Sequence, residues 1–116
     1  MEKSLYQLRI NVDEKHYESI TSILKLKQVN YKNGWSYDIV LEEESEHYNV
    51  IDKFLRVLQG KYERLKELGI KRDDITIWLI YGYNNQCNME FEPTLLKNLG
   101  ENGITFCISC YEAGCD

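Results

Sequence analysis

The sequence predicts an α+β fold, a two-layer sandwich in which the helices cover one face of a sheet. Short segments of alternating apolar residues, longer segments whose apolar residues recur every three or four positions, and an Asn-Gly pair between two alternating runs support this prediction. The order is strand, helix, hairpin, long helix, strand, short helix, strand. Its first six elements match a ferredoxin-like β-α-β-β-α-β core, to which a C-terminal helix and strand are added.

The first half of the chain changes period twice. Residues 5–12, LYQLRINV, alternate between apolar and polar side chains, which is typical of a strand with one buried face. Apolar residues then recur at helical spacing over residues 14–26. The Asn-Gly pair suits a type I′ turn, so a hairpin is expected, with one strand near 27–32 and another at 35–41.

The second half contains the strongest helical pattern and the most apolar strand. Apolar residues step by three and four between residues 51 and 68, which predicts one long helix that ends at Gly69. Residues 75–81, ITIWLIY, are apolar on both faces, as in a central strand. Pro93 suits the first turn of a short helix, and residues 104–111 form the last expected strand.

Size and charge limit the classes of function. The chain, residues 1–116, is expected to form a single domain. It has neither a signal peptide pattern nor an apolar stretch of roughly 18 residues, so a cytoplasmic protein with no membrane partner is expected. The formal charge is −5 and the basic residues are scattered, which argues against nucleic acid and is compatible with a basic protein partner.

The sheet face that the helices leave open can be assigned from the strand period. Trp78 and Tyr111 are its most informative members, because these residue types are frequent anchors of protein interfaces. Arg9 and Asp38 are its two charged residues, too few cations for an RNA-binding face. Cover of Trp78 by the chain itself or by a second subunit remains open. The residues expected on this face are Gln7, Arg9, Asn11, Ser36, Asp38, Val40, Thr76, Trp78, Ile80, Thr105, Cys107, Ser109 and Tyr111.

An acidic run, LEEESE, precedes the long helix. Its carboxylates could bind a basic partner or a cation, but acids ahead of a helix also interact favourably with the positive end of the helix dipole. Both interpretations stay open. The candidate protein-binding residues are Arg9, Asp38, Trp78, Tyr111, Glu42, Glu43 and Glu44.

The cysteines are candidate metal ligands. In an extended strand Cys107 and Cys110 point to opposite faces, so they could not share an ion. His16 and His47 have no spacing that suggests a site. No metal and no cofactor are therefore expected, with Cys110 in the core as a small apolar residue and Cys107 on the open face.

The motifs of common enzyme classes are missing. The chain has no phosphate-binding glycine loop, no dinucleotide-binding glycine motif and no H-E-x-x-H sequence, so it is expected not to be an enzyme. An alternative is a ligand-binding or enzymatic pocket beside the loop at 82–91. Its polar contacts would be Tyr83, Asn84, Asn85 and Cys87.

Several segments resemble those of a small bacterial α/β domain family of unknown function. The segments are YQLRINV, ITSILKLK, NGW, SYDI, IDKFLRVLQGKYERLKEL, ITIWLIY and FEPTLLKNLGENGITFCISCYE. Lys25 and Gln28 stand where the family usually has Gly and Pro. Some members are suspected of being immunity proteins, which bind a toxin and block it. The resemblance therefore implies a protein-binding domain that acts as an immunity-type inhibitor, whereas a homodimer with no catalytic activity would need the same exposed apolar surface.

Overall fold

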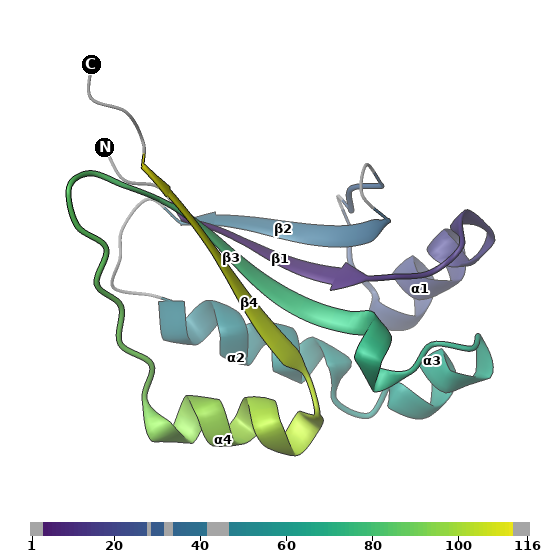
Figure 1. Ribbon diagram of the computed structural model, residues 1–116. Coiled ribbons are helices and arrows are strands. Elements are labelled where there is room, and N and C mark those ends of the chain that lie inside the picture. Colours follow the sequence, from purple (N-terminus) through teal and green to yellow (C-terminus); the bar gives the residue numbers. More distant parts are fainter. Residues whose placement is uncertain (1–3, 28, 32–33, 42–46, 113–116) are drawn as a thin grey trace.

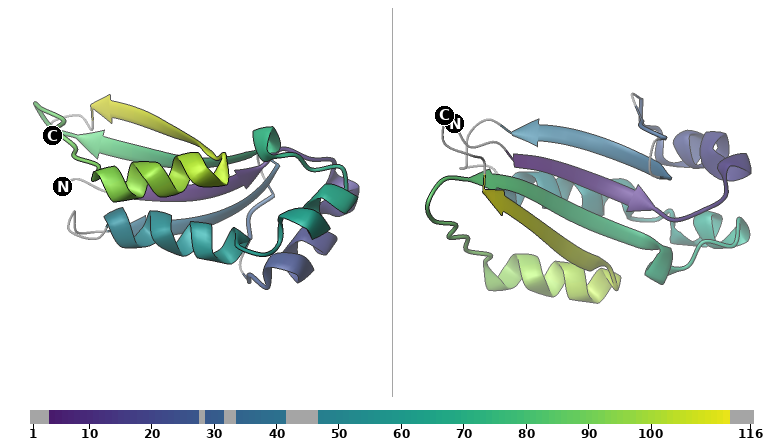
Figure 2. Two further views of the ribbon diagram at one scale, coloured as in Figure 1. Left: turned by 90° about the horizontal axis from the view of Figure 1, so that it is seen from below. Right: turned by 45° about the horizontal axis from the view of Figure 1, so that its top comes forward.

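The structure, a computed structural model, describes residues 4–27, 29–31, 34–41 and 47–112. It is α+β, as predicted, with a four-stranded sheet on one side and helices on the other (Figures 1 and 2). The strands are β1 (Ser4–Ile10), β2 (Trp35–Leu41), β3 (Ile75–Tyr83) and β4 (Thr105–Glu112). The α-helices are α1 (Tyr17–Leu24), α2 (His47–Leu58), α3 (Tyr62–Glu67) and α4 (Pro93–Asn102).

The sheet is mixed, with the strand order β2-β1-β3-β4. β1 is antiparallel to both β2 and β3, whereas β4 is parallel to β3. The parallel pair needs a crossover connection, which α4 provides. β3 has a neighbour on each side, which confirms the prediction that it is a central strand. β2 and β4 are the edges of the sheet.

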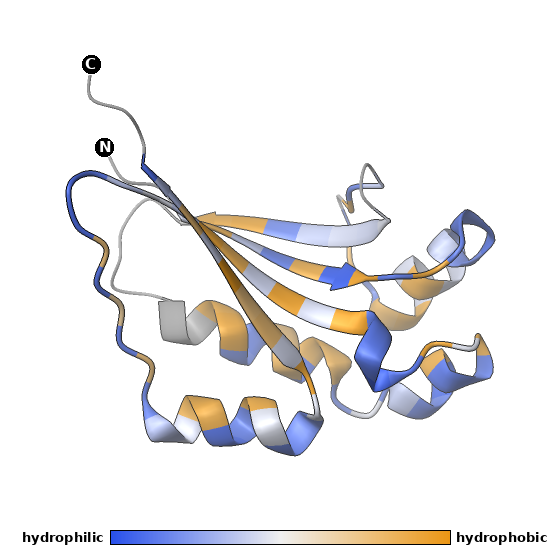
Figure 3. Cartoon of the chain, viewed as in Figure 1, coloured by the Kyte–Doolittle hydropathy of each residue, from blue (hydrophilic) through white to orange (hydrophobic). Residues whose placement is uncertain are grey.

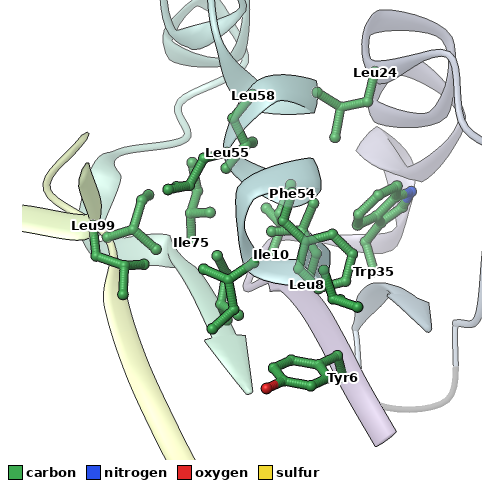
Figure 4. Packing of buried hydrophobic residues seen from close by; sticks show 14 of the residues in the cluster. Tyr6, Leu8, Ile10, Leu24, Trp35, Phe54, Leu55, Leu58, Ile75 and Leu99 are labelled. Atoms are coloured by element: carbon green, nitrogen blue, oxygen red, sulfur yellow. The ribbon is translucent and has the colours of Figure 1, made fainter. Parts of the chain in front are cut away.

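The core lies between the sheet and the helices. Tyr6, Leu8 and Ile10 of β1 belong to one buried cluster with Phe54 of α2, and Figure 4 shows Leu8 next to Phe54 and Tyr6 farther along the strand. Trp35 is fully buried, and its indole Nε1 donates a hydrogen bond to Thr21 Oγ1 of α1 at 3.0 Å. Figure 3 shows the alternation of apolar and polar residues along the strands that produces this single buried face. Among the described helices none is long and apolar enough to cross a membrane.

The predicted hairpin is wrong in its first arm. The described part of residues 27–32 contains no strand; it contributes a single bridge, in which Asn30 and Ser36 exchange two backbone hydrogen bonds of 2.7 and 2.8 Å. β2 instead takes β1 as its main partner. Residues 27–32, KQVNYK, are mostly polar, so a longer strand there would have few apolar side chains to bury.

The predicted long helix is also wrong, because it is two helices. α2 ends at Leu58 and α3 begins at Tyr62, with Gly60 between them at a φ of +77°. Glycine adopts that left-handed conformation at little cost, so the chain turns there while the apolar period resumes with Leu65 in the core. α3 ends at Glu67, and Gly69 follows it in the predicted left-handed conformation, with a φ of +87°.

Candidate functional site

The sheet face that points away from α2 and α4 presents rows of side chains across the strands. The register of the strands confirms the assignment made from the sequence period, with two differences. Leu5 joins the face, and Asn11 lies beyond the end of β1. The rows are Ser36–Arg9–Thr76–Thr105, Asp38–Gln7–Trp78–Cys107 and Val40–Leu5–Ile80–Ser109.

Side-chain hydrogen bonds fix the polar part of this face. Gln7 Nε2 donates to Asp38 Oδ1 at 3.1 Å, and Arg9 Nε donates to Gln7 Oε1 at 2.8 Å. Ser36 Oγ lies 3.4 Å from the same Asp38 oxygen. Gln7 is only 8% exposed, so its amide serves mainly to connect the two charged groups. Arg9 and Asp38, which are far apart in sequence, are therefore held in one network.

Trp78 lies beneath Arg9 in the middle of the face. The Arg9 guanidinium carbon is 4.3 Å from the centre of the indole ring, which is cation–π geometry. Trp78 Nε1 donates a hydrogen bond to Thr76 Oγ1 at 3.1 Å. Trp78 is half-buried, so the alternative that the chain itself covers it is met in part, by Arg9. Three of the predicted site residues, Arg9, Asp38 and Trp78, thus lie close together.

An apolar band adjoins this network at the other end of the strands and extends across the sheet from Val40 on the edge strand β2 to Tyr111 on the edge strand β4. Val40 is 60% exposed and shares a row with Leu5 and Ile80. Tyr111, the fourth predicted site residue in the described chain, is 51% exposed and packs its ring over Gly82. A Cβ placed on Gly82 would be 2.8 Å from Tyr111 Cζ, so glycine is what allows the ring to lie against the sheet. The sequence period of β1 could have revealed Leu5, since it stands two positions before Gln7.

The cysteines in β4 point to opposite faces, as predicted, with Cys107 beside Trp78 on the open face. The prediction that Cys110 lies in the core is wrong, because Cys110 is exposed. β4 is an edge strand, and toward its C-terminal end it rises away from α4 (Figure 1). α4 therefore does not cover the C-terminal half of the strand. No group of three potential metal-ligating side chains comes together within the residues that the structure describes.

The loop at 82–91 does not gather the polar contacts expected of a ligand site. Tyr83 and Cys87 pack against the core as partly buried residues. Asn84 and Asn85 are exposed, and Asn85 adopts a φ of +66° in a turn that Gln86 closes through a backbone hydrogen bond of 2.7 Å to Asn84. The asparagines therefore turn the chain, which is a common role for this residue type.

A hollow of about 300 Å³ lies instead beside α3 and the start of β3. The Arg72 guanidinium carbon is 3.5 Å from the centre of the Tyr62 ring, and Arg72 Nη1 donates a hydrogen bond to the Asn102 carbonyl at the end of α4. Tyr62 Oη donates to Asn102 Oδ1 at 2.7 Å. Burial raises the pKa of Tyr62, and the positive charge of Arg72 partly offsets this rise. These contacts link α3 to the end of α4 beside the hollow. Its lining residues are Tyr62, Glu63, Leu65, Lys66, Ile70, Lys71, Arg72 and Ile75.

The remaining predicted site residues, Glu42, Glu43 and Glu44, lie outside the described residues. The described open face has one cation, Arg9, and one anion, Asp38, so its own formal charge is balanced. The described part of this face therefore contributes nothing to the net charge of −5. Comparison of the chain with family models, with curated proteins and with solved structures gives no match.

Proposed function

We propose that the protein is a non-enzymatic, cytoplasmic protein-binding domain that needs no cofactor and binds its partner through the open sheet face. The observation that supports this proposal most is the Arg9–Trp78 stack beside an apolar band that ends in two exposed side chains, Val40 on one edge strand and Tyr111 on the other. Aromatic and arginine side chains provide much of the binding energy in protein interfaces. The hydrogen bonds of Gln7 hold the polar groups in place before binding, which lowers the entropic cost of association.

The partner that this surface suits is a protein, with apolar side chains for the band and hydrogen-bonding groups for Arg9 and Asp38. The net charge of −5 would speed the approach of a basic partner. Such a partner agrees with the immunity-type role, in which the domain covers and blocks a toxin. Since nucleic acid would be repelled by the same charge, it is a poor candidate.

The fold relationship belongs to the same proposal. In a ferredoxin-like core the first two strands run parallel and the third lies between them, antiparallel to both. The bridge at Asn30 is antiparallel to β2, and β2 is antiparallel to β1, so residue 30 stands at the place of the second strand. α4 and β4 would then be the added helix and strand. The proposed core is thus ferredoxin-like with its second strand reduced to one bridge.

The test is partner capture with variants on and off the face. The tagged protein, its Val40→Asp variant and its Tyr111→Ala variant are incubated with native cell extract at low and at high salt, and captured proteins are identified by mass spectrometry. Leu96→Ala is the matched control, because Leu96 on α4 is as exposed as Tyr111 but lies away from the sheet. Circular dichroism checks that each variant is folded.

We expect a stoichiometric basic protein whose affinity falls about tenfold or more in both face variants and is unchanged in Leu96→Ala. Equal capture by all four proteins would show that the open face is not the binding surface. Recovery of the chain alone, with a mass that depends on concentration, would favour the homodimer.

A further inference from the structure

Two thiols from distant parts of the chain meet on the helix side of β4. Cys87 Sγ and Cys110 Sγ are 3.4 Å apart, although the residues are 23 positions apart in the sequence. Cys110 pairs with Tyr81, whose side chain is buried, so both sulfurs lie on the face opposite to Cys107. The two cysteines carry no disulfide in this structure. A disulfide requires about 2.05 Å between the sulfurs, so they would have to approach by about 1.4 Å.

The chain around Cys87 can supply that movement. Residues 84–92 connect β3 to α4 without a helix or strand of their own, and they run from the end of β3 down to α4 (Figure 1). Phe91 fixes the far end of this connection, because its ring packs edge to face against the Phe106 ring of β4, with 5.3 Å between the ring centres. Cys87 thus lies near β4 in a connection that belongs to no helix or strand, and such segments shift more easily than the strands of a sheet.

Exposure decides which thiol can react first. Cys110 is exposed at the sheet edge, while Cys87 is half-buried behind it. An oxidant in solution therefore reaches Cys110, and the neighbouring thiol of Cys87 is placed to displace whatever group Cys110 has acquired. This arrangement of an accessible thiol with a resolving thiol is typical of cysteines that oxidise reversibly.

We propose that Cys87 and Cys110 are a reversible redox modification site, which a low-molecular-weight disulfide such as oxidised glutathione converts to an intramolecular disulfide. The Cys110 thiolate attacks one sulfur of the oxidant, forms a mixed disulfide and releases one glutathione thiolate. The Cys87 thiolate then attacks the Cys110 sulfur and releases the second. The two cysteines together lose two electrons and two protons. The oxidant gains the electrons, and the protons end on the two released thiols.

The disulfide would join the 84–92 connection to the edge strand and would enclose α4 in a covalent loop. Cross-links over loops of this length stabilise mainly by restricting the unfolded chain. The bond forms on the helix side of the sheet, so it leaves Arg9 and Trp78 on the open face unchanged. Tyr111 follows Cys110 in β4 but points to the opposite face. The two proposals use different faces of the sheet, so one can fail without the other.

The test uses the reduced full-length protein and oxidised glutathione, with and without later dithiothreitol. Cys87→Ser and Cys110→Ser remove the pair, and Cys107→Ser is the matched control, since it removes a thiol from the same strand on the other face. Intact mass, peptide mapping and the melting temperature are measured for each protein.

Wild type and Cys107→Ser should become about 2 Da lighter without a retained adduct, because the two thiols lose two hydrogens. Their melting temperature should rise by about 10 °C and return with dithiothreitol. Cys87→Ser should instead retain glutathione on Cys110, with no such rise. A stable glutathione adduct on wild-type Cys110, or a disulfide that maps to Cys107 or Cys115, would overturn the proposal.

Discussion

Among single residues, Gly82 has the clearest effect on the shape of the open face. Its missing side chain leaves room for the Tyr111 ring, which would otherwise meet a Cβ at 2.8 Å. Its backbone does not need glycine for conformational reasons, since its φ is not positive. The requirement comes from the contact alone, and aromatic cover of a glycine in a neighbouring strand is a known way to stabilise a sheet.

The Gly82→Ala variant should displace the Tyr111 ring. We expect a loss of about 1 kcal/mol in the free energy of unfolding, since the ring can swing out but loses its contact with the sheet. Urea denaturation measures this loss. Gly100→Ala is the control, because its Cβ would meet nothing within 4 Å in α4 and should stabilise the protein by about 1 kcal/mol. If both variants are equally stable, the contact at Gly82 has no energetic effect.

Lys25 carries local strain at the end of α1. Its φ of 56° and ψ of 44° are left-handed, and its N–H donates to the Thr21 carbonyl. A side chain in this conformation costs about 1 kcal/mol relative to glycine, and Lys25 is exposed, so little packing is lost. Lys25→Gly should therefore raise the free energy of unfolding by about 1 kcal/mol, as measured by urea denaturation. If Lys25→Gly lowers the free energy of unfolding as much as the exposed control Lys27→Gly does, the strain is absent.

At the scale of elements, α3 and α4 are joined by Tyr62, Arg72 and Asn102. Tyr62→Phe removes the hydrogen bond of 2.7 Å to Asn102 and should cost about 1 kcal/mol. Arg72→Ala removes the cation above the Tyr62 ring. Because the two side chains share the partner Asn102, the double variant should lose less stability than the two single losses added together. Arg64→Ala on the exposed side of α3 is the control, and strict additivity of Tyr62→Phe with Arg72→Ala would contradict the coupling.

The sequence predicts the positions of helices and strands correctly where the spacing of apolar residues agrees with the positions of Gly, Pro and turn-forming residues. The predictions of β3 and α4 are confirmed. A run that is apolar on both faces favours a central strand, and a Pro at a first turn marks the start of a helix. Gly60 was missed because glycine inside a helical period can be tolerated, and only packing decides whether the chain turns there. The prediction of a strand near 27–32 is wrong because an Asn-Gly turn specifies that the chain reverses but not how long the two paired strands are.

For the whole molecule, the sequence predicts which side chains share the open face but not which of them meet. Strand alternation assigned Arg9, Asp38 and Trp78 to one face from each strand separately. Their contact depends on β1 lying between β2 and β3, and strand order is set by packing of the entire chain. The contact between Cys87 and Cys110 could not be predicted from the sequence either, because Cys87 lies in a connection without helix or strand and Cys110 lies in an edge strand.

Whole-molecule stability should fall in alkali. Burial raises the pKa of the Tyr6 phenol above its ordinary value near 10, because the charged form would lie in the core. The folded state then keeps a proton that the unfolded state releases. The contribution of Tyr6 to the free energy of unfolding is fully present below pH 10, and it is lost at about 1.4 kcal/mol for each pH unit above pH 10. Urea denaturation at pH 9, 10 and 11, which are about one unit below, at and above that value, should show a shallower loss for Tyr6→Phe than for wild type. Equal slopes in the two proteins would mean that Tyr6 ionises as easily in the folded as in the unfolded chain.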